Sequence, residues 1–470
     1  MIKPSFLIGL LETDKEILAH KFDEDLPIWP IIRHDIITNI INHNNNLVIP
    51  HSKSKPKFAS LLKTIWVAIY KNPLIIKRNK IIFFNSGITN IKQDTDGRYF
   101  NRVTDQFFSK IQEDAVLIED TAMGELRLPR VHDKAYPHLA LIAVSKILGF
   151  FRKISETEIE SIENMLNCIY KILIKENIQF NEAALRNIGF NNVLGYLKKR
   201  RAYELFFKLK KPKIIFLEDA SYGNKSFISI PAKKQGILII ELQHGFINED
   251  HIAYNLGPGV MNAEVIKQFY PDTFFAYGEF WKKSISIPSK ILSIGNPFLT
   301  AQVQQFKAQD INANSCKNIL FISSAVSMLE TVAFVTTLKQ TADLHNYGVT
   351  IRPHPLELNV VQARYQSLIL LGVKISHSNS VYSDFSTHDI IIGEVSTALF
   401  ESLIIPNKRH FLFTSSYTKS YLNESITIPQ INKDSISIIF EESNFSQVNS
   451  LYFWEDNWEE NFINALKQFK

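Results

Sequence analysis

The stretch Lys213–Asn255 contains two apolar runs, each followed at once by polar side chains that can do chemistry. The first run is Ile214–Leu217 and the second is Ile237–Leu242, with room between them for a short helix. This pattern predicts a β-α-β unit whose strands lie in a parallel sheet buried on both faces. Such sheets bind ligands outside the carboxyl ends of their strands. One edge of the sheet is therefore expected to carry the residues that follow the two runs: Glu218, Asp219, Gln243, His244 and Gly245.

Length and charge limit the classes of protein that this chain can belong to. With 470 residues, of which 45% are hydrophobic, the chain is too long for one ordinary core and predicts two domains. The formal net charge of +5 suits an acidic substrate or an anionic membrane face, but it falls short of a nucleic-acid-binding composition. We therefore expect no nucleic acid among the partners.

Cysteine usage and hydropathy point to the cytoplasm. The two cysteines, Cys168 and Cys316, lie far apart in ordinary surroundings and predict neither a disulfide framework nor a zinc site. No run of about 18 uncharged apolar residues is present, so no bilayer-spanning helix is expected. The protein is predicted to be cytoplasmic, with peripheral association at the cytoplasmic face of the inner membrane as the only route to a membrane.

Strand-like and helix-like segments alternate in both halves of the chain, which predicts an α/β fold of two Rossmann-like doubly wound domains facing across a cleft. The expected N-terminal domain covers residues 1–300 and the C-terminal domain residues 315–470. The polar, weakly patterned segment 302–315 is the expected linker. Ten short apolar runs are predicted to be strands: residues 81–84, 115–118, 214–217, 237–242, 273–277, 291–294, 318–322, 349–351, 373–376 and 389–392.

Two basic segments precede the central unit. Residues 51–57, HSKSKPK, read most simply as a solvated loop, and residues 198–213 as a basic helix with a solvated face. For both, attraction to anionic lipid or to an acceptor polymer is the sharper alternative.

The predicted C-terminal domain offers two groups of phosphate-binding candidates. Arg352, His354 and Pro355 follow a strand, where a cation and a hydrogen-bond donor held by prolines suit a nucleotide phosphate. Glu394, Ser396 and Thr397 follow another strand and open a helix, where free backbone N–H groups favour a phosphate. A plain helix N-cap is the alternative for this second group.

The predicted N-terminal domain offers candidates for the chemistry itself. His244 can act as a base near neutral pH, and Asp219 or Glu218 can take a proton or attack an anomeric carbon. Gln243, His251 and Tyr254 are expected to line the acceptor side of the same pocket. The acidic and histidine residues show no spacing typical of a metal site, so none is expected.

Several short motifs resemble those of GT-B fold glycosyltransferases of bacterial surface and capsular polysaccharide synthesis. The pattern is similar to polysialyl- and Kdo transferases that use CMP-activated acidic sugars, and more distantly to CDP-glycerol polymerases. The motifs that carry the resemblance lie between about residues 210 and 405: QHGFINEDHIAY at 243–254, YGEFWKK at 277–283, SIGNP at 293–297, RPHP at 352–355 and GEVSTALFE at 393–401.

The resemblance implies a glycosyltransferase that needs no cofactor and moves a sugar from a nucleotide donor, CMP-linked rather than UDP-linked, onto a glycan or glycolipid acceptor. By that similarity His354, Ser396 and Thr397 would hold the donor, and Asp219 or His244 would act on the acceptor. Three alternatives stay open: a CDP-polyol phosphotransferase, a nucleotide-sugar 2-epimerase, and a non-catalytic component of capsule assembly.

Overall fold

The computed structural model describes residues 2–469 except residues 14, 24, 46–57, 94–95, 123–124, 309–316, 379, 406, 422–425 and 442–449. The chain forms two compact units. Of the described residues, those through Pro297 and those from Glu455 onward form unit 1, and those from Phe298 to Trp454 form unit 2. The sequence placed residues 455–470 in the second domain, whereas their helix packs on the core of unit 1.

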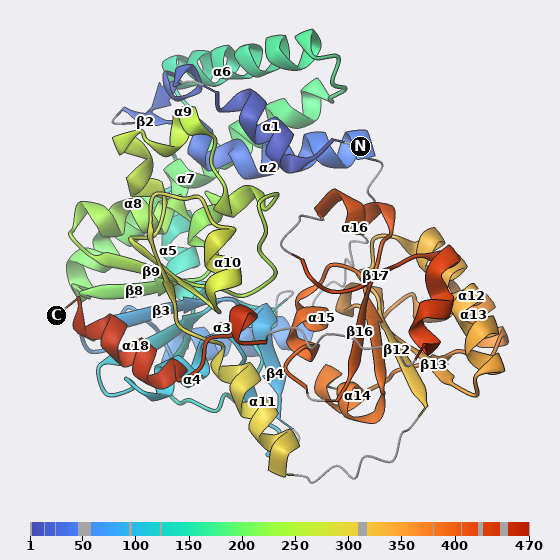
Figure 1. The fold of residues 1–470 in the computed structure, drawn as a ribbon. Helices are drawn as coiled ribbons and strands as arrows, with labels where there is room; N and C mark the ends of the chain where they lie inside the picture. Colours follow the sequence, from blue (N-terminus) through green and yellow to red (C-terminus); the bar gives the residue numbers. More distant parts are fainter. Residues whose placement is uncertain are drawn as a thin grey trace. The chain divides into compact units, whose positions relative to one another are not determined.

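Unit 1 is built on a parallel sheet of seven strands (Figure 1). Their order across the sheet is β11-β10-β9-β8-β3-β6-β7, and every neighbouring pair is parallel. Taken in chain order this is the dinucleotide-fold order 3-2-1-4-5-6 with one strand added, so the order reverses between β3 and β8. The strands are β3 (Ile81–Asn85), β6 (Ala115–Glu119), β7 (Ala135–Pro137), β8 (Ile214–Leu217), β9 (Leu238–Leu242), β10 (Thr273–Ala276) and β11 (Lys290–Ser293).

Helices cover both faces of this sheet because its strands are apolar on both sides. Helices α5, α7 and α8 cover one face, and α4 and α18 cover the other (Figure 1). The helices of unit 1 are α1 (Pro4–Leu11), α2 (Trp29–Asn45), α3 (Phe58–Tyr70), α4 (Asp105–Ser109), α5 (Leu139–Leu148), α6 (Glu156–Lys175), α7 (Glu182–Lys210), α8 (Ser226–Lys234), α9 (Pro258–Met261), α10 (Glu279–Lys283) and α18 (Trp458–Lys467). Two small antiparallel pairs complete it: β1 (Lys21–Phe22) with β2 (Leu26–Pro27), and β4 (Asn90–Lys92) with β5 (Tyr99–Asn101).

A buried ion pair fixes the N-terminal helices to the segment that follows β9. Arg33 Nε lies 2.7 Å from Glu12 Oε1, and both side chains are almost fully buried. Arg33 also donates to the carbonyl of Asn255 at 2.8 Å, and Glu12 accepts from the backbone N–H of Gly257 at 2.6 Å. The contacts hold α1 and α2 beside residues 252–257.

Unit 2 repeats the same topology with six parallel strands in the order β14-β13-β12-β15-β16-β17. In chain order this is again 3-2-1-4-5-6, with the reversal between β12 and β15. The strands are β12 (Asn318–Ile322), β13 (Gly348–Arg352), β14 (Lys374–Ile375), β15 (Ile390–Gly393), β16 (Arg409–Phe413) and β17 (Gln430–Ile431). The predicted fold class, two doubly wound α/β domains, is confirmed by the two strand orders.

Helices α12 and α13 pack on one face of this sheet, and α14 and α15 lie against the other (Figure 1). The helices of unit 2 are α11 (Pro297–Ala308), α12 (Met328–Leu344), α13 (Val361–Leu370), α14 (Val381–Thr387), α15 (Thr397–Ser402), α16 (Ser416–Tyr421) and α17 (Ser450–Phe453). Of the predicted linker 302–315, the first part is helical in α11 and residues 309–315 lie outside the described residues. Within the described chain, no helix is long and apolar enough to cross a membrane.

Candidate active site

The candidate site lies at the carboxyl edge of the unit 1 sheet, where the strand order reverses. Glu218 and Asp219 follow β8, and Glu218 accepts a hydrogen bond of 2.6 Å from the backbone N–H of Ser86, which follows β3. Asp219 has a left-handed backbone with φ 58°. This conformation is unusual outside glycine, although Asp and Asn tolerate it, and it occurs preferentially where a side chain is positioned for function.

Asp219 contacts two groups that can carry positive charge. Its Oδ1 lies 3.2 Å from His244 Nε2, and its Oδ2 lies 3.6 Å from Lys225 Nζ. Lys225 is the residue before α8 and also donates to the carbonyl of Glu218 at 2.7 Å. The side chains of Asp219, His244 and Lys225 are 29%, 20% and 15% exposed, so a ligand can reach the group without unfolding the edge of the sheet.

The charges in this group make the Asp219 carboxylate a weak base, which leaves the His244 imidazole as the candidate base. Burial raises the pKa of Asp219, but His244 and Lys225 lower it by more and leave it below its usual value. Burial raises the pKa of Glu218, with Asp219 adding to the rise. An ionised Asp219 can only accept hydrogen bonds, so it holds the His244 proton on Nε2 and leaves the lone pair on Nδ1.

His244 Nδ1 is buried and has no hydrogen-bond partner among the described residues. A buried polar atom without a partner costs free energy and calls for an explanation. The next residue, Gly245, leaves space at this turn, since a Cβ atom placed there would meet no atom within 4 Å. A hydroxyl group entering beside this turn would satisfy Nδ1.

Glu241 is a part of the site that the sequence analysis did not identify. It lies within β9, is fully buried, and accepts from Ser221 N at 3.0 Å, from Ser221 Oγ at 2.5 Å and from Tyr254 Oη at 2.9 Å. Burial raises its pKa to about 7. A carboxylate inside the otherwise apolar run 237–242 was the available signal, because such a residue stays buried only with polar partners.

The three residues predicted to line the acceptor side have different environments. Gln243 is buried, accepts from the backbone N–H of Tyr277 at 2.8 Å and donates to the carbonyl of Gly245 at 2.9 Å, so it orders the turn that carries His244. Tyr254 is buried against Glu241. His251 Nε2 lies 3.4 Å from Tyr222 Oη, and burial lowers the pKa of His251 to about 3, which keeps the imidazole neutral.

A second histidine pair stands beside the site. Asp120, which follows β6, contacts Nδ1 of His138, and the Nε2 of His138 lies 2.6 Å from Tyr203 Oη. Burial raises the pKa of Asp120, but His138 and then Lys225 and Lys199 bring it below its usual value. His138 follows no predicted strand and fits no recognisable motif, because its contact with Tyr203 depends on the packing of α5 against α7.

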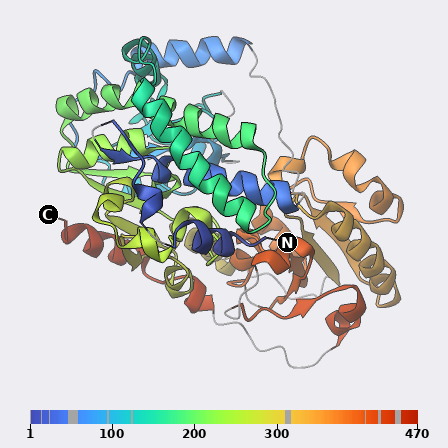
Figure 2. The ribbon, with the colours of Figure 1, turned by 90° about the horizontal axis from the view of Figure 1, so that it is seen from above.

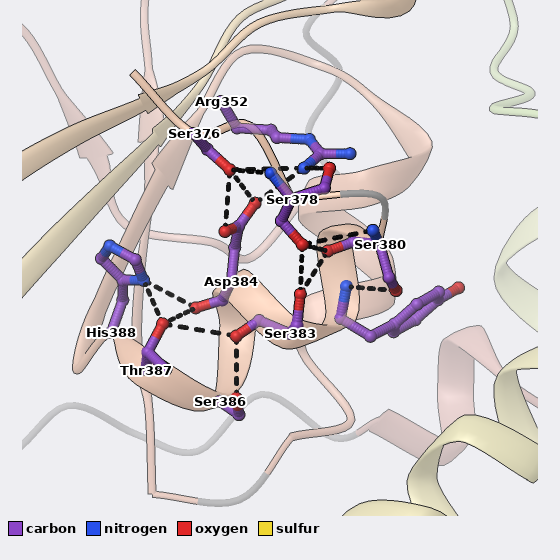
Figure 3. Close-up of polar contacts among 10 residues, drawn as sticks. Arg352, Ser376, Ser378, Ser380, Ser383, Asp384, Ser386, Thr387 and His388 are labelled. Atoms are coloured by element: carbon purple, nitrogen blue, oxygen red, sulfur yellow. Dashed lines mark hydrogen bonds and ion pairs between the residues drawn. The ribbon is translucent and has the colours of Figure 1, made fainter. Parts of the chain in front are cut away.

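In unit 2 the predicted phosphate ligands lie at the carboxyl edge of the sheet, and several are engaged within the protein. The Arg352 guanidinium lies 3.0 Å from Asp384 Oδ2 and 3.3 Å from Ser376 Oγ, and it donates to the carbonyl of Ser378 (Figure 3). Ser376 donates to both carboxylate oxygens of Asp384 at 2.8 and 2.7 Å. Arg352 therefore ties the end of β13 to α14.

His354 and Pro355 begin a short 3₁₀ turn. His354 Nδ1 accepts from the backbone N–H of Leu356 at 3.2 Å, and Glu357 accepts from the backbone N–H of His354 at 2.7 Å. Because Nδ1 is the acceptor, a neutral His354 carries its proton on Nε2. In this tautomer Nε2 has the donor character that a phosphate oxygen needs.

The second group of predicted phosphate ligands joins β12 to β15. Glu394 is fully buried and accepts from Ser324 N at 3.3 Å and from the hydroxyls of Ser324 and Ser415. Ser396 is the N-cap of α15 and accepts from the backbone N–H of Leu399 at 3.3 Å, and Thr397 is the first residue of that helix. The N-cap alternative describes the observed role of Ser396, while nucleotide binding by this edge stays a prediction.

Among the described residues, no three His, Cys, Asp or Glu side chains are grouped as ligands of one ion. The absence of a metal stays a prediction.

Comparison with known proteins gives likeness of structure alone. No family model matches the sequence, and no curated protein matches it. The chain is similar over 83% of its length to UDP-GlcNAc 2-epimerase from Methanocaldococcus jannaschii, with 11% identity, a TM-score of 0.45 and 99% of that chain covered. It is also similar over 83% of its length to UDP-GlcNAc 2-epimerase from Neisseria meningitidis, with 11% identity, a TM-score of 0.44 and 99% of that chain covered.

A further solved structure is the wall teichoic acid polymerase TagF, which matches over 88% of this chain and 97% of its own, with 14% identity and a TM-score of 0.44. At these scores and identities the likenesses identify neither a family nor an activity. The resemblance to polysialyl- and Kdo transferases stays a prediction.

Proposed function

We propose that the protein is a nucleotide-sugar-dependent glycosyltransferase in which His244, oriented by Asp219, is the base that activates an acceptor hydroxyl. The observation that carries the proposal is the His244–Asp219 pair of 3.2 Å at the switch point of the unit 1 sheet, with the opposite ring nitrogen buried and unpartnered. A carboxylate that fixes one tautomer of a partly exposed histidine is a recurring arrangement for proton abstraction from a hydroxyl.

In the proposed reaction the acceptor hydroxyl gives its proton to His244 Nδ1 while its oxygen forms a bond to the anomeric carbon of the donor sugar. The bond between that carbon and the phosphate oxygen breaks, and its electron pair leaves with the nucleotide. Asp219 stabilises the imidazolium that forms. Lys225 adds positive charge beside Asp219, which keeps this carboxylate ionised throughout.

We further propose that the carboxyl edge of the unit 2 sheet binds the donor's nucleotide, with a CMP-linked acidic sugar as the favoured donor. His354 would donate to the phosphate, and Ser396 and Thr397 would add hydroxyl groups. Arg352 would act through Asp384 and Ser376, by holding the loop after β14, because its guanidinium is already paired there. The resemblance of the short motifs supports the CMP assignment.

Ligand-dependent melting tests the donor. A ligand that binds only the folded state raises the melting temperature, so the protein is heated with CMP, CDP, UDP or GDP. The proposal expects the largest rise with CMP and its loss in His354→Ala. A matched variant, His345→Ala, changes an exposed histidine of the same unit that follows α12 and precedes β13, outside the proposed site, and should keep the full rise. A response to UDP alone would overturn the CMP assignment.

Product analysis tests the reaction with the nucleotide sugar whose nucleotide gives the largest rise. Glycosyl transfer requires an acceptor and leaves a glycosidic bond in the product. Turnover without acceptor would instead identify an epimerase, and a phosphodiester in the product would identify a polyol phosphotransferase. Absence of turnover together with wild-type behaviour of His244→Gln in cells would identify a non-catalytic component.

A further inference from the structure

Helix α3 lies on the outside of unit 1 (Figure 2). It exposes several large apolar side chains. Its buried positions Thr64, Val67 and Ala68 lie on one face of the helix. Apolar residues also occupy the opposite face, including Trp66 at 68% exposure and Ile69 at 63%. A surface helix normally carries polar residues there, so an outward apolar face marks a site of interaction.

The turn after α5 adds two exposed aromatic rings. Phe150 and Phe151 are 74% and 88% exposed and pack edge to face with centroids 5.0 Å apart. Gly149 seats this turn against α7, because a Cβ atom at Gly149 would lie 2.3 Å from the carbonyl oxygen of Lys198. The two rings therefore project from a turn that is packed on the helix beneath it.

The elements that carry these side chains are neighbours in unit 1. Helix α3 packs on α5, and α5 packs on α7. Lys210 on α7 donates to the carbonyls of Leu74 and Ile76 at 2.7 and 2.6 Å, which places the exposed Ile75 beside the end of α7. We call this surface the outer apolar face and define it by Trp66, Ile69, Ile75, Phe150, Phe151 and Leu209.

Within the segments that form the outer apolar face, the charged residues are almost all basic. The segments that form it, residues 58–80, 139–153 and 198–211, contain a single acidic residue, Glu204, which lies 3.7 Å from Arg200. Lysine and arginine side chains are exposed at its borders: Lys77, Lys146, Lys153, Arg201 and Lys208. A second copy of this chain would bring the same positive charge to the contact, which disfavours self-association.

We propose that the outer apolar face docks on the surface of a lipid bilayer that contains anionic headgroups. Tryptophan and other aromatic rings favour the boundary between headgroups and acyl chains, and the surrounding lysines and arginines are attracted to anionic lipid. The apolar side chains of this surface match the acyl-chain boundary of the membrane, and the basic side chains match its anionic headgroups. The docking does not depend on the reaction proposed above.

Vesicle flotation tests the proposal with the full chain. Wild-type protein is mixed with phosphatidylcholine vesicles with or without 30% phosphatidylglycerol, and the bound fraction is measured. We expect binding to the anionic vesicles, reduced at least tenfold in Trp66→Ser/Phe150→Ser/Phe151→Ser. Loss of two charges in Lys146→Gln/Lys153→Gln should weaken binding about 25-fold, because each basic side chain near an anionic surface contributes roughly a fivefold effect.

The control is Leu344→Ser/Leu370→Ser, which removes two apolar side chains of unit 2 that are both 82% exposed and should bind as wild type does. All variants should melt within a few degrees of wild type, because the changed side chains are exposed. Equal binding by the triple variant, or no binding to either vesicle, would overturn the proposal. A dimer that forms in gel filtration and disappears in the triple variant would assign the face to self-association instead.

Discussion

At the residue scale, the backbone of Asp219 shows how a local conformation serves the candidate site. With φ at 58°, its carboxylate turns back toward both His244 and Lys225. Asparagine adopts this conformation as readily as aspartate, so an amide can replace the carboxylate without a change of backbone.

Asp219→Asn should therefore fold normally and lose transfer activity. The amide no longer fixes the His244 tautomer and no longer stabilises the imidazolium, so we expect kcat to fall by about 10²- to 10⁴-fold. Asp114→Asn is the control, because Asp114 forms an exposed pair with Lys80 at the opposite end of the strands. Steady-state kinetics with an identified donor measure the effect, and an unchanged kcat in Asp219→Asn would contradict the assignment of His244 as the base.

Glu241 should make the stability of the protein depend on pH. Its pKa rises from 4.5 to about 7 in the folded state, chiefly through burial, so between these values the folded protein holds a proton that the unfolded chain releases. The free energy of unfolding therefore falls as pH rises from about 4.5 to 7. The shift corresponds to a contribution of about 3 kcal/mol.

Glu241→Gln should remove this contribution. A glutamine can still accept from Ser221 and can donate its amide N–H to a rotated Tyr254 hydroxyl. The variant should thus gain stability relative to wild type between pH 5 and 8, as measured by urea unfolding at each pH. A difference between the two proteins that does not change with pH would contradict the raised pKa.

At the element scale, the turn after β8 is positioned by close packing against α2. Gly223 has φ 80°, and a Cβ atom there would lie 2.2 Å from the carbonyl oxygen of Pro30. Gly236, after α8, has a similar φ of 70° but no atom within 4 Å of its Cβ position. Substituting each glycine by alanine therefore distinguishes the free-energy cost of the backbone conformation from the cost of the steric conflict.

Gly223→Ala should destabilise the protein by about 2–4 kcal/mol, because it combines an unfavourable backbone with a steric conflict. Gly236→Ala should cost only about 1 kcal/mol, because it carries the backbone term alone. Urea unfolding of both variants measures the two costs. Equal costs would show that the turn does not rest tightly on α2.

The elements themselves were largely predictable, and their ends were less so. The strands β8 and β12 have the predicted ends, because an apolar run bounded by polar residues defines a short buried strand. Strand β16 was not predicted: its sequence RHFLF is half polar, and it becomes a strand by pairing with β15 and β17. Helix α7 begins at Glu182, well before the basic helix predicted from residue 198. Its first half was missed because only the side that packs on α6 and α2 is apolar.

At the scale of the whole molecule, the last helix returns to the first unit. Phe462 on α18 is fully buried, and its ring lies 4.8 Å from that of Phe107 and 6.1 Å from that of Phe216. One face of the unit 1 sheet is therefore completed by the C-terminal end of the chain, more than 150 residues after Pro297.

Phe462→Ala should destabilise unit 1 by about 3–5 kcal/mol through the lost burial and the cavity that remains. Asn464→Ala on the exposed side of the same helix should change stability by less than about 0.5 kcal/mol. Urea unfolding followed by tryptophan fluorescence gives both values. A cost below about 1 kcal/mol for Phe462→Ala would show that α18 is not part of the unit 1 core.

The order of residues along the chain was enough to predict two doubly wound halves of alternating strands and helices, with Glu218, Asp219 and His244 after neighbouring strands. Local order is sufficient for this, because periodicity and strand ends are properties of short segments. The folded chain was needed to show that Lys225 and Glu241 join that group, that Asp384 holds Arg352, and that the final helix belongs to unit 1. Each of these contacts joins residues from different structural elements. They form only when the helices and loops pack around the sheets.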